Sequence, residues 1–215
     1  MAATKIEASN IAAGAVPSTG FTSVQVFTAV STWTKPTDIT KVIVEVQAAG
    51  GGSGAEAANN AGGSGGGGAY ALKVLDVTNV ATCTVTVGAA AAAATYSGTQ
   101  AGGTGGTSSF AYTSGTASFT TVSAIGGNGG GYNNYIGGGV TAAPTTGDIN
   151  MAGQAAQTVK DAGNSKWGFG GRQMNEGADA GRTGAGYGSG ANGAYATNTD
   201  GNVAQPGIVI VWEYK

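Results

Sequence analysis

The stretch SAIGGNGGGYNNYIGGG, residues 123–139, crowds glycine around two tyrosines and poses the question that decides the fold. Glycine makes up 42 of the 215 residues. Each glycine in regular structure is destabilising by roughly 0.5–1 kcal/mol relative to alanine, because its backbone loses more freedom on folding. A chain this rich in glycine is therefore either unfolded or uses glycine for something that no larger residue can do.

The spacing of the glycines favours a role in packing. The segments GGTGGT at 102–107 and GGNGGG at 126–131 repeat every three residues. Three is the period of an extended left-handed helix without internal hydrogen bonds, so its backbone groups must find partners outside it. Glycine on the faces of such helices lets neighbours approach closely and bond to each other. The alternative is a set of flexible linkers, which glycine-rich segments also form.

The composition favours a folded chain over a disordered one. Hydrophobic residues make up 41% of the sequence and charged residues 9%, with a net charge of −2, whereas disordered chains combine low hydrophobicity with high charge. Because the charge is near neutral and Arg172 and Arg182 are the two arginines, we expect no nucleic-acid partner. The single cysteine, Cys83, excludes an intrachain disulfide and is expected to be a small buried hydrophobe on a strand.

Alternating apolar residues predict strands towards both ends of the chain. Val42, Val44 and Val46 repeat with a period of two, which is typical of a strand that buries one face. Similar patterns occur in residues 24–34, 39–47, 69–77, 81–88, 117–125 and 206–215. Residues 35–38, KPTD, predict a turn with Pro36 at its favoured second position. We therefore expect a mainly β, sandwich-like domain over residues 25–215 that frames the glycine-rich extended helices and loops, with little or no α-helix.

Two short segments combine aromatic and polar side chains in a way that is typical of contact surfaces. Rigid aromatic rings with adaptable polar neighbours can stack on a sugar or dock a protein loop. The alternative is that these aromatic side chains only cap the bundle. The candidate receptor-binding residues are Tyr132, Asn133, Asn134 and Tyr135 in the first segment, and Lys166, Trp167, Phe169 and Arg172 in the second, where the scarce charges gather.

The sequence predicts no catalysis, no cofactor and no metal site. Histidine, the commonest general base and metal ligand, is absent from the chain. Asp161, Glu176 and Asp179 could converge as the paired carboxylates that cleave polysaccharides, but they are as readily solvated loop charges. The segment GSGANG at 188–193 fits the letters of a dinucleotide-binding fingerprint but lacks the strand before it and the helix after it.

Several segments, taken in order, resemble the glycine-rich domain of bacteriophage tail-fibre and receptor-binding proteins from about residue 24 to the C-terminus. They are VFTAVSTWTKPTDITKVIVEVQAAGGGSG at 26–54, AGGSGGGGAYA at 61–71, GGTGGTSSF at 102–110, VSAIGGNGGG at 122–131, GDINMAGQ at 147–154 and PGIVIVWEY at 206–214. The segment TKIEASNIAAGAV at 4–16 is similar to the attachment ends of phage fibres, with isolated apolar residues at Ile6, Ile11 and Val16.

This resemblance implies a non-enzymatic virion protein of the tail, in which strands frame a bundle of polyglycine-II-like helices and distal loops contact the host. Residues 1–24 would attach it to other tail or fibre proteins, and the receptor would be a surface glycan or an outer-membrane protein. Fibres are commonly trimeric and some tip adhesins are single chains, so a homotrimer is the expected assembly and a single chain is the alternative. The alternatives are a purely architectural tail or capsid protein and, outside any virus, an ice- or surface-binding protein.

The chain departs from the family pattern where alanine replaces glycine. These positions are Ala48, Ala49 and the alanines of 89–94. Alanine fits only on helix faces that point away from a close neighbour, so we expect a smaller bundle, partly replaced by ordinary loop and sheet.

Overall fold

The computed structural model of the chain describes residues 20–56, 61–97, 101–132, 136–157, 160–172, 184–194 and 198–215. Within these residues the chain is mainly β and has no helix, which confirms that part of the prediction. The strands are β1 (Phe21–Phe27), β2 (Ser31–Thr34), β3 (Lys41–Gln47), β4 (Tyr70–Asp76), β5 (Val80–Thr86), β6 (Ser108–Gly115), β7 (Val122–Ala124), β8 (Ile149–Met151), β9 (Trp167–Phe169), β10 (Ala185–Tyr187) and β11 (Ile208–Tyr214).

Two open antiparallel sheets pack face to face around one hydrophobic core. The large sheet has the strand order β1-β11-β3-β4-β8, and the small sheet has the order β2-β5-β6-β7. Val42, Val44 and Val46 of β3 point into the core and are fully buried, as their alternation predicts. Cys83 and Val85 of β5 meet them from the small sheet, which confirms Cys83 as a buried hydrophobe.

The predicted strand 24–34 is two strands that belong to different sheets. β1 pairs with β11 in the large sheet, and β2 pairs with β5 in the small sheet, so the bend between them carries the chain across the sandwich. The turn predicted at 35–38 is present: the Ile39 amide donates to the Pro36 carbonyl at 3.3 Å, and Asp38 has a left-handed φ of 66°. β6 was not predicted, because its apolar side alternates Phe110 with small and hydroxyl residues.

One carboxylate is buried inside the sandwich and is fully occupied by donors. Glu213 of β11 points towards the core. Its oxygens accept hydrogen bonds from the Trp33 indole at 2.7 Å, the Gln25 amide at 2.7 Å and the Ser23 hydroxyl at 2.5 Å. Because a buried carboxylate without donors is strongly destabilising, these three bonds fix how β1, β2 and β11 meet.

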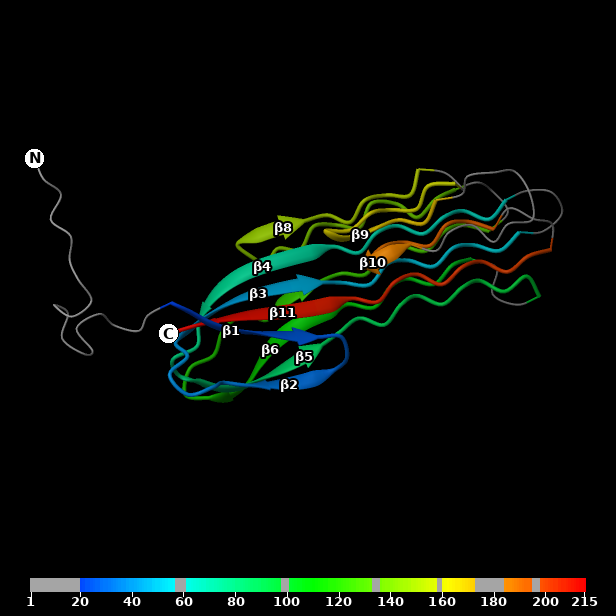
Figure 1. Cartoon of the computed structure of the whole chain (residues 1–215). Helices are drawn as coiled ribbons and strands as arrows, with labels where there is room; N and C mark the ends of the chain where they lie inside the picture. The colour runs from blue at the N-terminus through cyan, green and yellow to red at the C-terminus, as the bar shows by residue number, and fades with distance from the viewer. Residues whose placement is uncertain are drawn as a thin grey trace, which may run out of the picture.

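Extended segments leave one end of the sheets and run side by side to the far end of the molecule, opposite the C-terminus (Figure 1). We call them the glycine bundle. They comprise residues 48–56, 61–69, 87–94, 101–107, 125–132, 136–141, 152–157, 160–165, 170–172, 188–194 and 198–207.

The segments of the bundle are joined by backbone hydrogen bonds that repeat every three residues. Successive amides of 48–56 donate in turn to 61–69, to 101–107 and to 198–207, and then the cycle starts again. One such cycle consists of Gly51 to Gly66 at 2.9 Å, Gly52 to Gly103 at 2.9 Å and Ser53 to Asn202 at 3.2 Å. Segment 61–69 does the same towards 188–194, 125–132 and 152–157. The backbone polar groups of these irregular segments are thereby satisfied by their neighbours rather than by water.

Side-chain exposure follows the same period in the outer segments. Thr104 and Thr107 are exposed, and so are Ile125 and Asn128. The glycines between them face other segments: a Cβ on Gly105 would lie 2.4 Å from the Ala49 carbonyl oxygen, closer than real Cβ atoms come. The residues with side chains in GGTGGT and GGNGGG are therefore the ones that face solvent.

Two serines and several alanines replace glycine inside the bundle. Ser53 and Ser64 are fully buried, and their hydroxyls accept the amides of Asn202 at 2.6 Å and Gly193 at 2.9 Å. In the alanine run 89–94, Ala91 and Ala94 are buried, whereas Ala89 and Ala92 are exposed.

The expectation that alanine keeps to outward faces is wrong for Ala48, Ala49, Ala91 and Ala94. Ala48 belongs to the core of the sandwich, and Ala49 is also fully buried, where the bundle joins the sheets. Ala91 packs in a small apolar cluster with Ala191 and Ala204. The methyl groups of Ala48 and Ala91 are therefore accommodated in clusters of apolar side chains.

Candidate functional site

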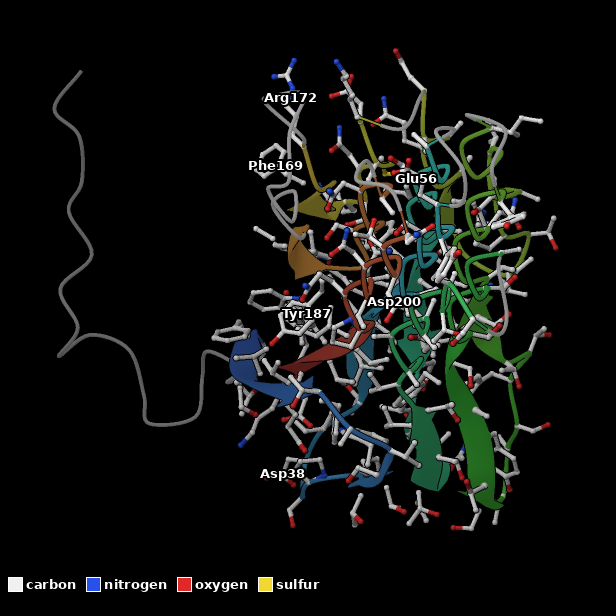
Figure 2. The ribbon with its side chains drawn as sticks, turned by 90° about the vertical axis from the view of Figure 1, so that its right-hand side faces the viewer. Asp38, Glu56, Phe169, Arg172, Tyr187 and Asp200 are labelled. Atoms are coloured by element: carbon white, nitrogen blue, oxygen red, sulfur yellow. The ribbon has the colours of Figure 1, made fainter. Side chains whose placement is uncertain are left out.

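A polar groove of about 340 Å³ opens between three segments of the bundle, 154–157, 161–164 and 169–172. The side chains that shape it are Gln154, Gln157, Asp161, Asn164, Phe169 and Arg172. Figure 2 looks at the far end of the molecule and shows Phe169 and Arg172 at the edge of this view, away from Glu56 and Asp200 near its centre. These two groove residues therefore lie at the periphery of the molecule (Figure 2).

A two-stranded ribbon carries the aromatic wall of the groove. β9 pairs with β10 so that Gly168 faces Gly186. Gly186 has a left-handed φ of 83°, and a Cβ on it would lie 2.3 Å from the Trp167 carbonyl oxygen, so this position requires glycine. The close contact at the two glycines leaves the side chains of Trp167 and Phe169 outside, 41% and 79% exposed.

Hydrogen bonds fix the base of this ribbon to the large sheet. The Lys166 amide donates to the side-chain oxygen of Gln47 at 3.2 Å, and Gln47 is fully buried at the end of β3. The Ser165 hydroxyl donates to the Tyr187 carbonyl at 2.5 Å. The aromatic side chains thus project from a backbone that is anchored at both strands.

Amide side chains form the floor of the groove. The Gly170 amide donates to Asn164 Oδ1 at 2.7 Å, and the Asn164 amide donates to Gln154 Oε1 at 3.3 Å. Both amide side chains are thereby oriented while keeping their NH₂ groups for other partners. Such oriented amides are suited to hydroxyl and carbonyl groups of a ligand.

The far wall holds an ion pair. Arg172 Nε lies 3.1 Å from Asp161 Oδ1, and the two residues also form an isolated β-bridge. Both side chains are largely exposed, so the pair contributes only about 0–1 kcal/mol to stability. Its effect is to hold the guanidinium in place, with donors left over for a ligand. Of the described residues that line the groove, Asp161 is the one carboxylate.

The predicted contact residues divide into three groups. Phe169 and Arg172 line the groove together. Lys166 and Trp167 lie next to it on the ribbon, with the Lys166 ammonium 5.8 Å from the Trp167 ring centroid, as in a cation–π contact. Tyr132 ends segment 125–132 and does not line the groove.

Other predicted residues lie outside the described part of the chain. These are Asn133, Asn134, Tyr135, the attachment residues Ile6, Ile11 and Val16, and the acidic residues Glu176 and Asp179. Asp161 is described, and its partner is Arg172 rather than a second carboxylate.

The sequence interpretation missed Gln154, Gln157 and Asn164. Isolated amides in irregular segments carry no periodic signal. The one available cue was their closeness in the chain to the charges at 160–182.

The described part of the chain holds no group of three or more metal-ligating side chains. In that part, no helix is long and apolar enough to cross a membrane.

The abundance of glycine agrees with the family to which the chain belongs. The family model described as a glycine-rich domain matches residues 23–213, so the chain is a member of the glycine-rich domain family. No curated protein matches the chain.

Proposed function

We propose that the chain is a non-enzymatic adhesin of a bacteriophage tail, in a tail fibre or at the tail tip, that binds a receptor on the host cell surface. The resemblance of residues 24–215 to the glycine-rich domain of phage receptor-binding proteins supports the class of protein. The observation that carries receptor binding is the groove with its exposed Phe169 beside the oriented amides and Arg172. The protein then belongs to the virion tail and needs no cofactor.

The bundle is the proposed support for this groove. Its segments are assigned as polyglycine-II-like helices, because successive amides of 48–56 donate to three different neighbours and the pattern repeats every three residues. Rigid elements hold a binding site more precisely than free loops do. Many copies on one particle would add avidity to a modest single site.

A surface glycan or an outer-membrane protein fits the chemistry of the groove. The exposed face of Phe169 suits the apolar face of a sugar ring or a protein loop, and the amides of Gln154 and Asn164 suit hydroxyl or carbonyl groups. Residues 1–24 are proposed to attach the domain to another tail or fibre protein through Ile6, Ile11 and Val16, which precede β1, a strand whose outer face is exposed.

A competition assay tests the proposal. Purified protein is incubated with host cells, and phage adsorption is then counted. The wild type should reduce adsorption in a dose-dependent manner. The double variant Phe169→Ala, Arg172→Ala should compete at least tenfold less, because tenfold corresponds to about 1.4 kcal/mol and truncation of a hot-spot aromatic or arginine costs about 2 kcal/mol or more. Tyr96→Ala removes an exposed aromatic side chain outside the groove and should compete like the wild type.

Either of two results would reject part of the proposal. A folded double variant with full competition would move the receptor contact away from the groove. No competition by the wild type at saturation would favour the alternative function, in which the protein is an architectural part of the tail or capsid and the glycine bundle is a rigid spacer.

A further inference from the structure

The outer face of the large sheet is apolar from one edge to the other. Strand register aligns the outward side chains in rows that cross the sheet. One row runs Val26, Ile210, Glu45, Leu72 and Ile149, and the next runs Val24, Trp212, Ile43 and Val74. The residues at the ends of these rows, Val24, Val26, Val74 and Ile149, are 42–55% exposed, whereas Ile210 and Glu45 in the middle of the first row are already buried within the one chain.

The outer face of the small sheet is different in kind. There, Thr82 bonds to Ser114 at 2.6 Å, and Thr84 bonds to Thr113 at 2.8 Å, so hydroxyl groups cover the surface. This is the ordinary pattern of a sheet with one face on the core and one in water. The same chain therefore builds one outer face for solvent and another that is not suited to it.

The sequence of the large sheet also indicates burial on both faces. β11 reads IVIVW and β3 reads VIVEV, without the alternation of apolar and polar residues seen in β5. Near-continuous apolar strands are typical of sheets that are covered on both sides. Glu45 is the carboxylate in the middle of the face. It accepts hydrogen bonds from the Tyr70 hydroxyl at 2.6 Å and from the Trp212 indole at 2.8 Å.

A projecting side chain, Phe21 (the knob), and a hollow lined by Ile43, Val74 and Tyr214 (the recess) lie next to each other on this face. Phe21 is 58% exposed and packs its ring 6.0 Å from Trp212 and 5.9 Å from Tyr214. Beside it, Ile43, Val74 and Tyr214 line a shallow hollow of about 290 Å³ whose rim carries Lys41 and Lys215. A face with both a knob and a recess can pair with itself, because a two-fold axis brings each knob to the recess of the other copy.

We propose that this face is a two-fold interface between two copies of the chain, with Phe21 of each copy seated in the Ile43–Val74–Tyr214 hollow of the other. At about 4.8 Å between strands and 3.3 Å per residue, the face measures roughly 20 Å by 20 Å. Two such faces together cover about 800 Å², below the roughly 1,200 Å² of stable specific interfaces, so we expect a weak dimer that forms only at high protein concentration. The net charge of −2 gives little repulsion between copies.

Sedimentation velocity of the full chain from about 1 to 200 µM tests the interface, since contacts of this size are concentration-dependent. The wild type should form dimers in this range. Val74→Glu puts a charge in the hollow at a position that is 52% exposed, and it should weaken dimerisation at least 100-fold without unfolding the chain. The matched control is Thr84→Glu on the outer face of the small sheet, which should dimerise like the wild type.

Disulfide trapping tests the arrangement itself. Cys83 is buried, so a cysteine added on the face is the accessible thiol. Phe21 and Val74 lie on strands three places apart in the sheet, about 14 Å, which is too far for a bond within one chain. Phe21→Cys mixed with Val74→Cys should give the mixed covalent dimer in excess over either homodimer. A wild type that stays monomeric at 200 µM, a trimer, or a dimer insensitive to Val74→Glu would overturn the proposal.

Discussion

Gly65→Ala tests the role of glycine at one of the most crowded contacts of the bundle. A Cβ at this position would lie 1.8 Å from the Gly51 carbonyl oxygen, whereas real Cβ atoms stay beyond 3.0 Å. Segments 48–56 and 61–69 must then separate by more than 1 Å at this point. Both are central, with hydrogen-bonded neighbours on several sides, so neither can move without breaking other bonds.

The magnitude follows from the hydrogen bonds at that contact. Gly65 donates to Ala191 at 2.7 Å, Gly51 donates to Gly66 at 2.9 Å, and Ala191 donates to Gly51 at 3.0 Å. Each buried hydrogen bond left unmade costs roughly 1–3 kcal/mol of stability. Replacing glycine with alanine offsets about 0.4–1 kcal/mol of this loss, because alanine reduces the conformational entropy of the unfolded chain. We expect a net loss of about 4 kcal/mol, which for a chain of this size lowers Tm by roughly 10 °C.

Gly103→Ala is the matched control. There the nearest atoms, of Ala92, lie 3.5 Å from the added Cβ, an ordinary contact. Its stability should lie between the wild-type value and a gain of about 1 kcal/mol. Urea unfolding and scanning calorimetry measure both variants. A Gly65→Ala protein within about 0.5 kcal/mol of Gly103→Ala would refute the account of glycine as a packing surface.

Three further predictions concern buried side chains of the described structure. Trp33→Phe removes one donor from buried Glu213 and should lower the free energy of unfolding by about 1–3 kcal/mol in urea; unchanged stability would contradict the hydrogen-bond network. Burial raises the pKa of the Cys83 thiol to about 12, so the native protein should not react with DTNB at pH 8 until it unfolds, and rapid native reaction would show that the core is open. Burial also raises the pKa of Glu56 above 4.5, so its stabilising effect is fully present below pH 4.5 and is lost as pH rises through the folded pKa. Glu56→Gln should therefore match the wild type in Tm near pH 4 and exceed it at pH 7, and a Tm difference that does not change with pH would be evidence against this linkage.

The sheets were predictable from the sequence where side chains alternate cleanly. The alternation of Val42, Val44 and Val46 predicted both β3 and the face that it buries. The alternation of Cys83 and Val85 predicted the same for β5. β6 was not predicted, because the aromatic residues on its core side, Phe110 and Tyr112, stand among small and hydroxyl residues. β9 was not predicted, because WGF is too short for a periodic signal. The change of sheet between β1 and β2 was not predicted, because residues 24–34 combine apolar and hydroxyl residues typical of strands and contain no glycine or proline to mark the bend.

The three-residue period of glycine predicted that the glycine-rich segments pack against other extended segments, but it did not predict which segments pair. GGTGGT and GGNGGG indicate a three-residue repeat, and hydrogen bonds at that period join their segments in the structure. Partners such as Gly52 and Gly103 are distant in the chain, and glycine has no side chain that encodes the choice. Phe169 and Arg172 of the groove were predicted from aromatic and charged residues, whereas Gln154 and Asn164 were missed because their role depends on tertiary contact.

Amide hydrogen exchange in segments 48–56 and 61–69 tests the central claim most directly. These residues lie outside regular strands, and as linkers they would exchange within seconds. If the bundle is one hydrogen-bonded body, the amides of Gly51, Gly54, Gly63 and Gly66 should be protected nearly as well as those of Val44 in β3, up to the free energy of global unfolding. Fast exchange of these four amides beside a protected Val44 would contradict the account and leave the glycine segments as flexible connections.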